Sequence, residues 1–174
     1  MKLREVAGPE AIDAAIASLA ARINDDYRGR ELVVVCVLKG SFMFVSDLVR
    51  KLEMPVKVDF IRASSYGDGT VSSGTVSFRV DVELDIDGKD VLILEDILDT
   101  GRTLVAVREH LVSRRPKSVA ACTFIDKPSR RAVDVKAEYT GLTVEDVFLV
   151  GYGLDLAEEY RNLHGLYEIL PEEA

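Results

Sequence analysis

Two adjacent acids and the short polar loop after them are the residues of this chain best suited to chemistry. Four branched apolar residues from Val91 precede Glu95 and Asp96, and Asp99-Thr100-Gly101-Arg102-Thr103 then leads into a helical pattern. The threonine hydroxyls, the loop amides and the unpaired N–H groups of the next helix can bind an anion, and Gly101 lets the backbone approach it closely. The pattern predicts a site for a phosphorylated sugar. A strand-to-helix turn with an Asp or Thr cap is the alternative, but such a cap requires neither paired acids nor a glycine.

The elements around this segment predict an α/β fold. The branched run before Glu95 lacks polar alternation, as in a strand buried on both faces of a parallel sheet, and ligands bind at the carboxyl ends of such strands. Strand-like and helical patterns alternate along the chain, which favours a single domain over residues 1–174 with a mostly parallel, twisted central sheet flanked by helices. The expected strands are 32–38, 56–64, 91–98 and 118–125, and the expected helices are 9–23, 42–52 and 103–115.

Other segments are less regular. Residues 65–74 are rich in Gly, Ser, Asp and Thr, which predicts a mobile lid or, alternatively, a hairpin tip. Residues 76–84 alternate as in a half-exposed strand, and 85–88 form a turn. Two late strands are expected at 133–137 and 147–150, followed by a short helix or irregular tail at 156–166.

Composition excludes several classes of function. The 174 residues carry 30 Asp and Glu against 22 Lys and Arg, a net charge of −8, which disfavours nucleic acid and anionic membranes as partners. No apolar run approaches the roughly 18 residues of a transmembrane helix, so we expect a cytoplasmic location. Cys36 and Cys122 lie in apolar runs and are expected in the core, whereas His110 and His164 lack metal-ligand spacing and are expected on the solvated surface.

The segment from Val91 to Leu104 resembles the phosphoribosyl-diphosphate (PRPP) signature of the phosphoribosyltransferases: a hydrophobic strand, two acids, two apolar residues and Asp-Thr-Gly-x-Thr. Lys39-Gly40 resembles the diphosphate loop of that family, although a plain strand-to-helix turn would have the same sequence. The run from Val150 to Asp155, with Arg161 after it and Asp-Lys-Pro-Ser-Arg-Arg upstream at 126–131, resembles the hypoxanthine-guanine phosphoribosyltransferases within the family. These blocks follow family order over residues 32–161.

The resemblance implies the type I phosphoribosyltransferase fold, with its PRPP motif at 91–104. It also implies a small base-recognition hood at about 127–161 and a lid at about 65–74. Ser65 and Tyr66, at the start of that lid, resemble the Ser-Tyr pair of purine phosphoribosyltransferases.

On the donor side, the resemblance implies that Glu95 and Asp96 hold the ribose hydroxyls and the Mg²⁺ around them. Asp155 would ligate a second Mg²⁺, a cation that prefers carboxylate and phosphate oxygens. Arg102 departs from the lysine or small polar residue common in the family, and this planar cation is expected to alter affinity rather than the reaction. The implied donor-binding residues are Lys39, Gly40, Glu95, Asp96, Asp99, Thr100, Gly101, Arg102, Thr103 and Arg161.

On the purine side, the resemblance implies that Asp99 faces N7 and acts as the catalytic base. Lys127 would donate to the 6-oxo group, the Phe148 ring would stack on the base, and the Leu149 backbone would meet its Watson–Crick edge. With Asp155, these residues are the expected purine site. Taken singly, each has an ordinary alternative: a solvated loop lysine, a core phenylalanine or a helix-capping aspartate.

The function implied is an enzyme that transfers the 5-phosphoribosyl group from PRPP to hypoxanthine or guanine, releasing diphosphate and forming IMP or GMP in purine salvage. A xanthine-preferring transferase is an alternative, whereas adenine, whose 6-amino group is itself a donor, is disfavoured by Lys127. A PRPP-binding regulator of nucleic acid is a further alternative that the acidic charge disfavours. Members of the family are commonly dimers or tetramers, so self-association is expected.

Overall fold

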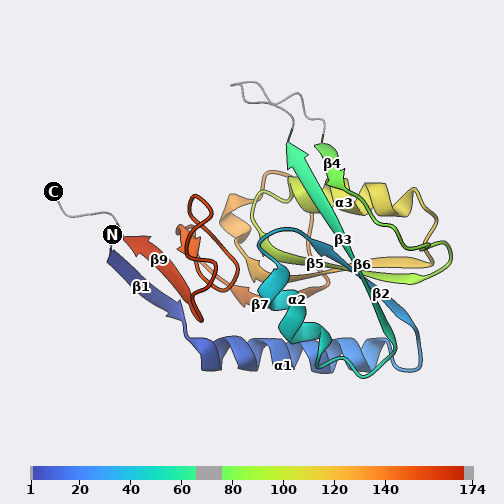
Figure 1. Ribbon diagram of the computed structural model, residues 1–174, viewed down its shortest axis with the longest axis horizontal. Helices are drawn as coiled ribbons and strands as arrows, with labels where there is room; N and C mark the ends of the chain where they lie inside the picture. Colours follow the sequence, from blue (N-terminus) through green and yellow to red (C-terminus); the bar gives the residue numbers. More distant parts are fainter. Residues whose placement is uncertain (1, 66–75, 171–174) are drawn as a thin grey trace.

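The larger of two sheets forms the centre of the fold. The structure, a computed structural model, describes residues 2–65 and 76–170 (Figure 1). The strand order is β4-β3-β2-β5-β6-β7, and every neighbouring pair is parallel except β3 and β4. The expected mostly parallel sheet is therefore confirmed. Its strands are β2 (Leu32–Val37), β3 (Val56–Ser65), β4 (Val76–Val80), β5 (Asp90–Leu98), β6 (Ser118–Asp126) and β7 (Tyr139–Thr143).

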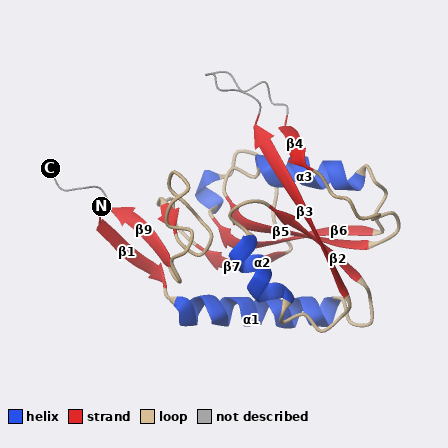
Figure 2. Ribbon diagram, in the orientation of Figure 1, coloured by secondary structure: helices blue, strands red, loops and turns tan. Residues whose placement is uncertain are grey.

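Helices cover both faces of this sheet. Helices α1 (Pro9–Asp26) and α2 (Phe42–Val49) lie on one face and α3 (Arg102–Val112) lies on the other (Figure 2). In β2, Val33 and Val35 pack in the core that includes α3, whereas Val34 and Cys36 pack in the core that includes α1 and α2. Burial of both faces explains the unbroken apolar runs of β2 and β5.

Two further expectations concern cysteines and membranes. Cys36 and Cys122 are buried and free, which confirms their assignment to the core. Within residues 2–65 and 76–170, none of the helices is long and apolar enough to cross a membrane.

A second sheet joins the two ends of the described chain. It consists of β1 (Lys2–Ala7), β9 (Leu166–Leu170) and β8 (Leu149–Val150), in the order β1-β9-β8 with antiparallel pairing. Neither β1 nor β9 is among the strands expected from the sequence. Residues 156–165 form the irregular alternative that was expected for 156–166, without a helix, and Leu166 begins β9. Because β8 belongs to this sheet, the sheet fixes the position of the neighbouring Phe148.

The strand expected at 133–137 is wrong, and the last strand of the large sheet is β7 instead. Ala132 N–H donates to the carbonyl of Thr100 at 3.0 Å. A Cβ on Gly101 would lie 2.5 Å from Val135 Cγ1 and 3.1 Å from Val133 Cγ2. The apolar residues that suggested a strand therefore pack against the polar loop after β5.

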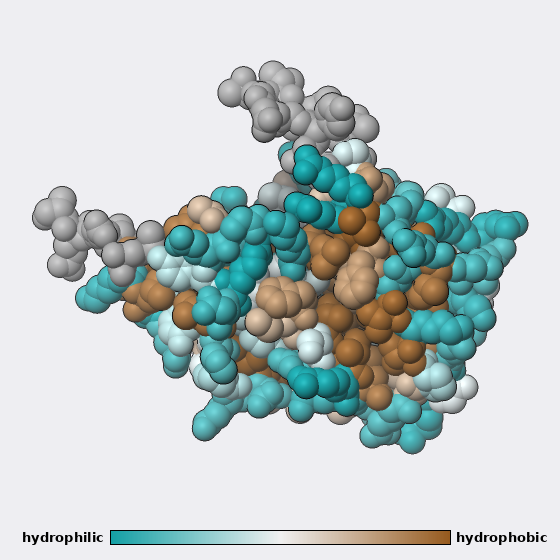
Figure 3. All heavy atoms as spheres, viewed as in Figure 1, coloured by the Kyte–Doolittle hydropathy of each residue, from teal (hydrophilic) through white to brown (hydrophobic). Residues whose placement is uncertain are grey.

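The outer face of β3 is unusually apolar for an exposed surface. Hydrophobic residues gather near the centre of the face shown in Figure 3. On β3, Val58 and Phe60 are each 40% exposed, and Phe42 and Val80 are exposed to a similar extent.

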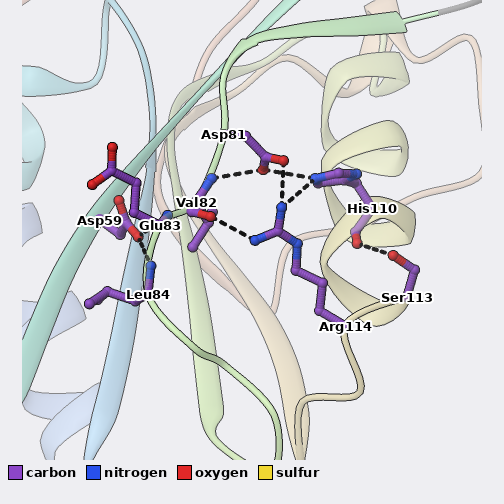
Figure 4. A network of polar contacts seen from close by, with 8 residues as sticks. All are labelled: Asp59, Asp81, Val82, Glu83, Leu84, His110, Ser113 and Arg114. Atoms are coloured by element: carbon purple, nitrogen blue, oxygen red, sulfur yellow. Dashed lines mark hydrogen bonds and ion pairs between the residues drawn. The ribbon is translucent and has the colours of Figure 1, made fainter.

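Strand β4 ends at Val80, four residues earlier than expected. The carboxylate of Asp59, which is buried, accepts hydrogen bonds from the N–H groups of Glu83 and Leu84, both at 2.8 Å (Figure 4). These bonds to a β3 side chain take the place of strand pairing, so residues 83 and 84 stay beside β3 without extending β4. The expected lid at 65–74 lies outside the described residues except for Ser65, the last residue of β3, and Tyr66 also lies outside them.

His110 is part-buried and paired, not simply solvated as expected. Its Nε2 lies 2.8 Å from Asp81 Oδ1, and its ring stacks on Phe78 with centroids 4.3 Å apart. Arg114 contacts the same carboxylate (Figure 4). His164 is exposed, as expected.

Candidate active site

The carboxyl ends of β2 and β5 border a first cavity. These adjacent parallel strands bring the Lys39-Gly40 turn beside the end of β5. Arg102, the first residue of α3, and Arg161 do not line this cavity. Its volume is about 360 Å³, and its lining includes the other predicted donor-binding residues, Lys39, Gly40, Glu95, Asp96, Asp99, Thr100, Gly101 and Thr103.

Glu95 and Asp96 lie within β5, and both border the cavity. Glu95 is 5% exposed, and its Oε2 has no hydrogen-bond partner among the described residues. Burial, with repulsion from Asp96, raises the pKa of Glu95 to about 8, and burial raises the pKa of Asp96 to about 6. Buried polar atoms are nearly always hydrogen-bonded, so the unpartnered oxygen marks a place where a ligand hydroxyl or cation would be stabilised.

The loop after β5 is shaped for an anion. Gly101 is the residue before α3 and has φ 84°, and a Cβ there would also collide with Val135. Only glycine fits both constraints. Helix α3 spans 11 residues and has no acidic residue in its first turn. Its free N–H groups and dipole can therefore stabilise a phosphate at this end.

Two glycines let three segments meet at the cavity. A Cβ on Gly40 would lie 1.7 Å from Asp96 Oδ2, and a Cβ on Gly153 would lie 2.1 Å from the carbonyl oxygen of Gly40. The turn that contains Gly40 is therefore held between β5 and the 151–154 segment. The Leu38–Lys39 peptide within this turn is cis.

A cluster of two cations and two carboxylates lies at the edge of the cavity; its members are Lys39, Arg161, Asp155 and Glu158. Lys39 Nζ is 2.7 Å from Glu158 Oε1, and Arg161 Nη2 is 3.0 Å from Glu158 Oε2 and 2.8 Å from Asp155 Oδ1. Hydrogen bonds from Lys39 and Arg161 lower the pKa of Glu158 to about 2. Glu158 has φ 70°, a conformation that is costly for a residue with a Cβ. Glu158 was not among the site residues expected from the sequence, although it lies between two of them, Asp155 and Arg161.

A second cavity, of about 480 Å³, contains the predicted purine residues. Lys127, Phe148, Leu149 and Asp155 line it together with Asp99. Lys127 is 6% exposed and its Nζ donates to the carbonyl of Val147 at 2.5 Å, so it is not a solvated loop lysine. Phe148 is 55% exposed, so its ring is not part of the core. The two cavities share Asp96, Ile97 and Asp99 in their linings.

Two arginines that the sequence analysis left without a role also contact this region. Arg130 Nε donates to Asp99 Oδ1 at 3.1 Å. Arg131 donates to the carbonyl oxygens of Leu98 and Asp99 and pairs with the carboxylate of Asp126. The block at 126–131 was part of the resemblance, but it gave these arginines no role, because their contacts with Leu98 and Asp99 join segments about 30 residues apart.

Similarity to known proteins agrees with this geometry. A profile of the phosphoribosyl transferase domain matches residues 6–157. The chain is 52% identical over 162 residues to the hypoxanthine phosphoribosyltransferase of Salmonella typhimurium, covering 91% of each chain. It is 44% identical over 169 residues to the hypoxanthine-guanine phosphoribosyltransferase of Aquifex aeolicus, covering 97% of this chain and 95% of that protein.

Solved structures show the same relationship. A hypoxanthine-guanine phosphoribosyltransferase from Bacillus anthracis aligns with a TM-score of 0.92 at 43% identity, covering 96% of this chain and 98% of that chain. A hypoxanthine phosphoribosyltransferase from Staphylococcus aureus aligns with a TM-score of 0.93 at 44% identity, covering 97% and 92%. Sequence and fold therefore agree over most of the molecule, and the chain belongs to the phosphoribosyltransferase family.

Proposed function

We propose that this enzyme transfers the 5-phosphoribosyl group of PRPP to hypoxanthine or guanine, releasing diphosphate and forming IMP or GMP. The observation that carries the proposal is the meeting of the two cavities at Asp96, Ile97 and Asp99. A sugar phosphate held by the loop after β5 and a base held beside Lys127 would meet at these residues. The names of the relatives support the same reaction.

On the donor side, the loop from Asp99 to Thr103 binds the 5-phosphate through its amides, its hydroxyls and the start of α3. Glu95 and Asp96 accept hydrogen bonds from the ribose hydroxyls, which gives the unpartnered Glu95 Oε2 a partner. Lys39 and Arg161 bind the diphosphate.

The carboxylates of this site fit Mg²⁺. No three His, Cys, Asp or Glu side chains form a complete metal cage in the described part of the chain, and Mg²⁺ ordinarily takes one or two carboxylates with substrate oxygens and water. Glu95, Asp96 and Asp155 would hold the ions, and the unpartnered Glu95 Oε2 is suited to a cation or hydroxyl. Bound Mg²⁺ would neutralise negative charge on the diphosphate.

On the purine side, Lys127 donates to the 6-oxo group, Phe148 stacks on the ring, and the Leu149 backbone meets the Watson–Crick edge. An amino group at that position would face the Lys127 ammonium, donor against donor, so adenine is disfavoured. Lys127 is held by the Val147 carbonyl, which places its ammonium directly beside the residue before Phe148.

The reaction displaces diphosphate from C1 of PRPP by the imidazole nitrogen of the purine, through a transition state with oxocarbenium character. Asp99 accepts the N7 proton as the new bond forms, a general-base step that typically contributes about 10²–10⁴-fold in rate. The carboxylates beside the ribose stabilise the positive sugar, and Lys39 and Arg161 stabilise the departing diphosphate.

The test is nucleotide formation by the purified protein with PRPP, Mg²⁺ and each of hypoxanthine, guanine, xanthine, adenine and uracil. We expect products from hypoxanthine and guanine; products from adenine or uracil alone, or from no base, would refute the proposal. Asp99→Asn should lower turnover by about 10²–10⁴-fold with little change in KM for PRPP. An unchanged rate in that variant would remove Asp99 from the base role.

We further propose self-association through the apolar face of β3, together with a cytoplasmic location. The exposed Val58 and Phe60 support the first statement, because large exposed apolar patches commonly mark interfaces. Sedimentation of wild type and Phe60→Asp tests it: a dimer or larger assembly is expected for the wild type only.

A further inference from the structure

Arg130 lies between two carboxylates that border the purine cavity. Its Nε is 3.1 Å from Asp99 Oδ1 and 3.6 Å from Asp146 Oδ1. Arg130, Asp99 and Asp146 all line the cavity that also contains Lys127 and Phe148. The side chain proposed to accept the N7 proton is therefore already engaged by a cation.

The backbone fixes Arg130 relative to Asp99. Arg130 ends the short 3₁₀ helix η1 (Pro128–Arg130), and its N–H donates to the carbonyl of Lys127 at 3.1 Å. On either side of η1, Lys127 N–H donates to the Leu98 carbonyl and Ala132 N–H donates to the Thr100 carbonyl, both at 3.0 Å. These two bonds bracket Asp99, so the segment that carries Arg130 is anchored to the loop that carries Asp99.

The contact occupies only one of the two carboxylate oxygens. Nε of Arg130 donates to Oδ1 of Asp99 and not to Oδ2. A hydrogen bond to one carboxylate oxygen restricts rotation of the carboxylate, and the second oxygen can still accept a proton. Activated bases in enzymes commonly depend on a third group that orients them in this way.

We infer that Arg130 is a positioning residue that orients the Asp99 carboxylate toward the N7 proton of the purine. The inference rests on the proposed function. It assigns Arg130 no contact with PRPP, because Arg130 lines the purine cavity and not the first cavity. Arg131 has a different role from Arg130, because it donates to main-chain carbonyls and therefore supports the loop itself.

The alternative is that Arg130 serves only the stability of the fold, and this role can be distinguished from positioning of Asp99. The side chains of Arg130 and Asp99 are 48% and 38% exposed, and ion pairs this exposed add little to folding stability. Removing the guanidinium should therefore leave the thermal midpoint nearly unchanged. A loss of rate would then reflect the geometry of Asp99.

The test is a double-mutant cycle of Arg130→Gln with Asp99→Asn, followed by initial rates with hypoxanthine at saturating PRPP and by KM for PRPP. We expect Arg130→Gln to lower kcat by about tenfold or more, since a misplacement of about 1 Å at a reacting site can cost roughly 10²-fold in rate. KM for PRPP should stay within about twofold, and Arg130→Lys should recover part of the rate because it restores the cation. In the Asp99→Asn background, Arg130→Gln should have no further effect.

The control is Arg28→Gln, which removes an exposed arginine paired with Asp25 at 2.6 Å in another part of the molecule. Its rate should equal that of the wild type. A wild-type rate in Arg130→Gln, or an equal loss with and without Asp99, would overturn the inference. If Arg130→Gln does not fold, the same cycle with Arg130→Lys decides between these outcomes. Absence of purine transfer by the wild type would refute the proposed function instead.

Discussion

Substitution of Gly40 by alanine should damage PRPP binding more than it damages the fold. The new Cβ would lie 1.7 Å from Asp96 Oδ2 and 2.8 Å from Asp96 Cγ. Ordinary nonbonded separations are about 3.5 Å, so roughly 1.5 Å or more of displacement is needed. The turn cannot retreat, because the Gly40 carbonyl already touches Gly153 on its other side. Asp96 must therefore move away from the position proposed for the ribose.

The expected losses of stability and of rate follow from this displacement. Overpacking of this kind typically costs about 1–3 kcal/mol, which corresponds to a Tm decrease of about 2–12 °C for a domain of this size. A misplacement of about 1 Å at a reacting site costs roughly 10²-fold in rate. We therefore expect kcat/KM for PRPP to fall by at least that factor, while most of the protein stays folded at 25 °C.

The assay compares initial rates against PRPP concentration with thermal unfolding of the same samples. Gly8→Ala is the matched control, because its Cβ would meet only the carboxylate end of the flexible Glu5 side chain, at 3.1 Å. Its rate and Tm should stay close to those of the wild type. A Gly40→Ala enzyme with wild-type kcat/KM for PRPP would refute the reasoning.

Two further predictions concern carboxylates. Glu158→Gln should lower KM for PRPP and the inhibition constant for diphosphate several-fold, because the Glu158 carboxylate competes with diphosphate for the two cations of its cluster. Glu159→Gln is the control, and a raised KM in Glu158→Gln would contradict this explanation. In the folded state, the pKa of Glu95 is raised from its ordinary value of 4.5 to about 8. The contribution of Glu95 to folding stability is therefore complete below pH 4.5 and is lost as the pH rises to about 8. Thermal unfolding in EDTA without PRPP should thus show the wild type losing stability over this window; an equal loss in Glu95→Gln would contradict it.

The sequence was most informative where local pattern and function coincide. The unbroken apolar run before Glu95 identified a buried parallel strand, and the glycine before α3 identified its turn, because both constraints act within a few residues. The resemblance to the phosphoribosyltransferases then predicted which polar loops meet. Adjacent parallel strands place their carboxyl ends at one edge, and the Lys39-Gly40 turn and the end of β5 do lie there.

The remainder depended on contacts between distant segments. Strands β1 and β9 pair the two ends of the described chain, and neither has a strong pattern of its own. Val133 and Val135 alternate as in a strand, yet they pack against Gly101. Arg130 contacts Asp99, 31 residues away, and Glu158 joins its near neighbour Arg161 to Lys39, which is 119 residues away.

Glu95 connects stability with function. A buried carboxylate oxygen without a partner is destabilising, and the neighbouring Asp96 adds repulsion. An apolar residue at this position would suit the centre of the sheet better, since the strand around it is buried on both faces. Local departures from good folding chemistry are expected at functional sites. In the proposed function, a bound ribose hydroxyl or cation would supply the partner that Glu95 Oε2 lacks among the described residues.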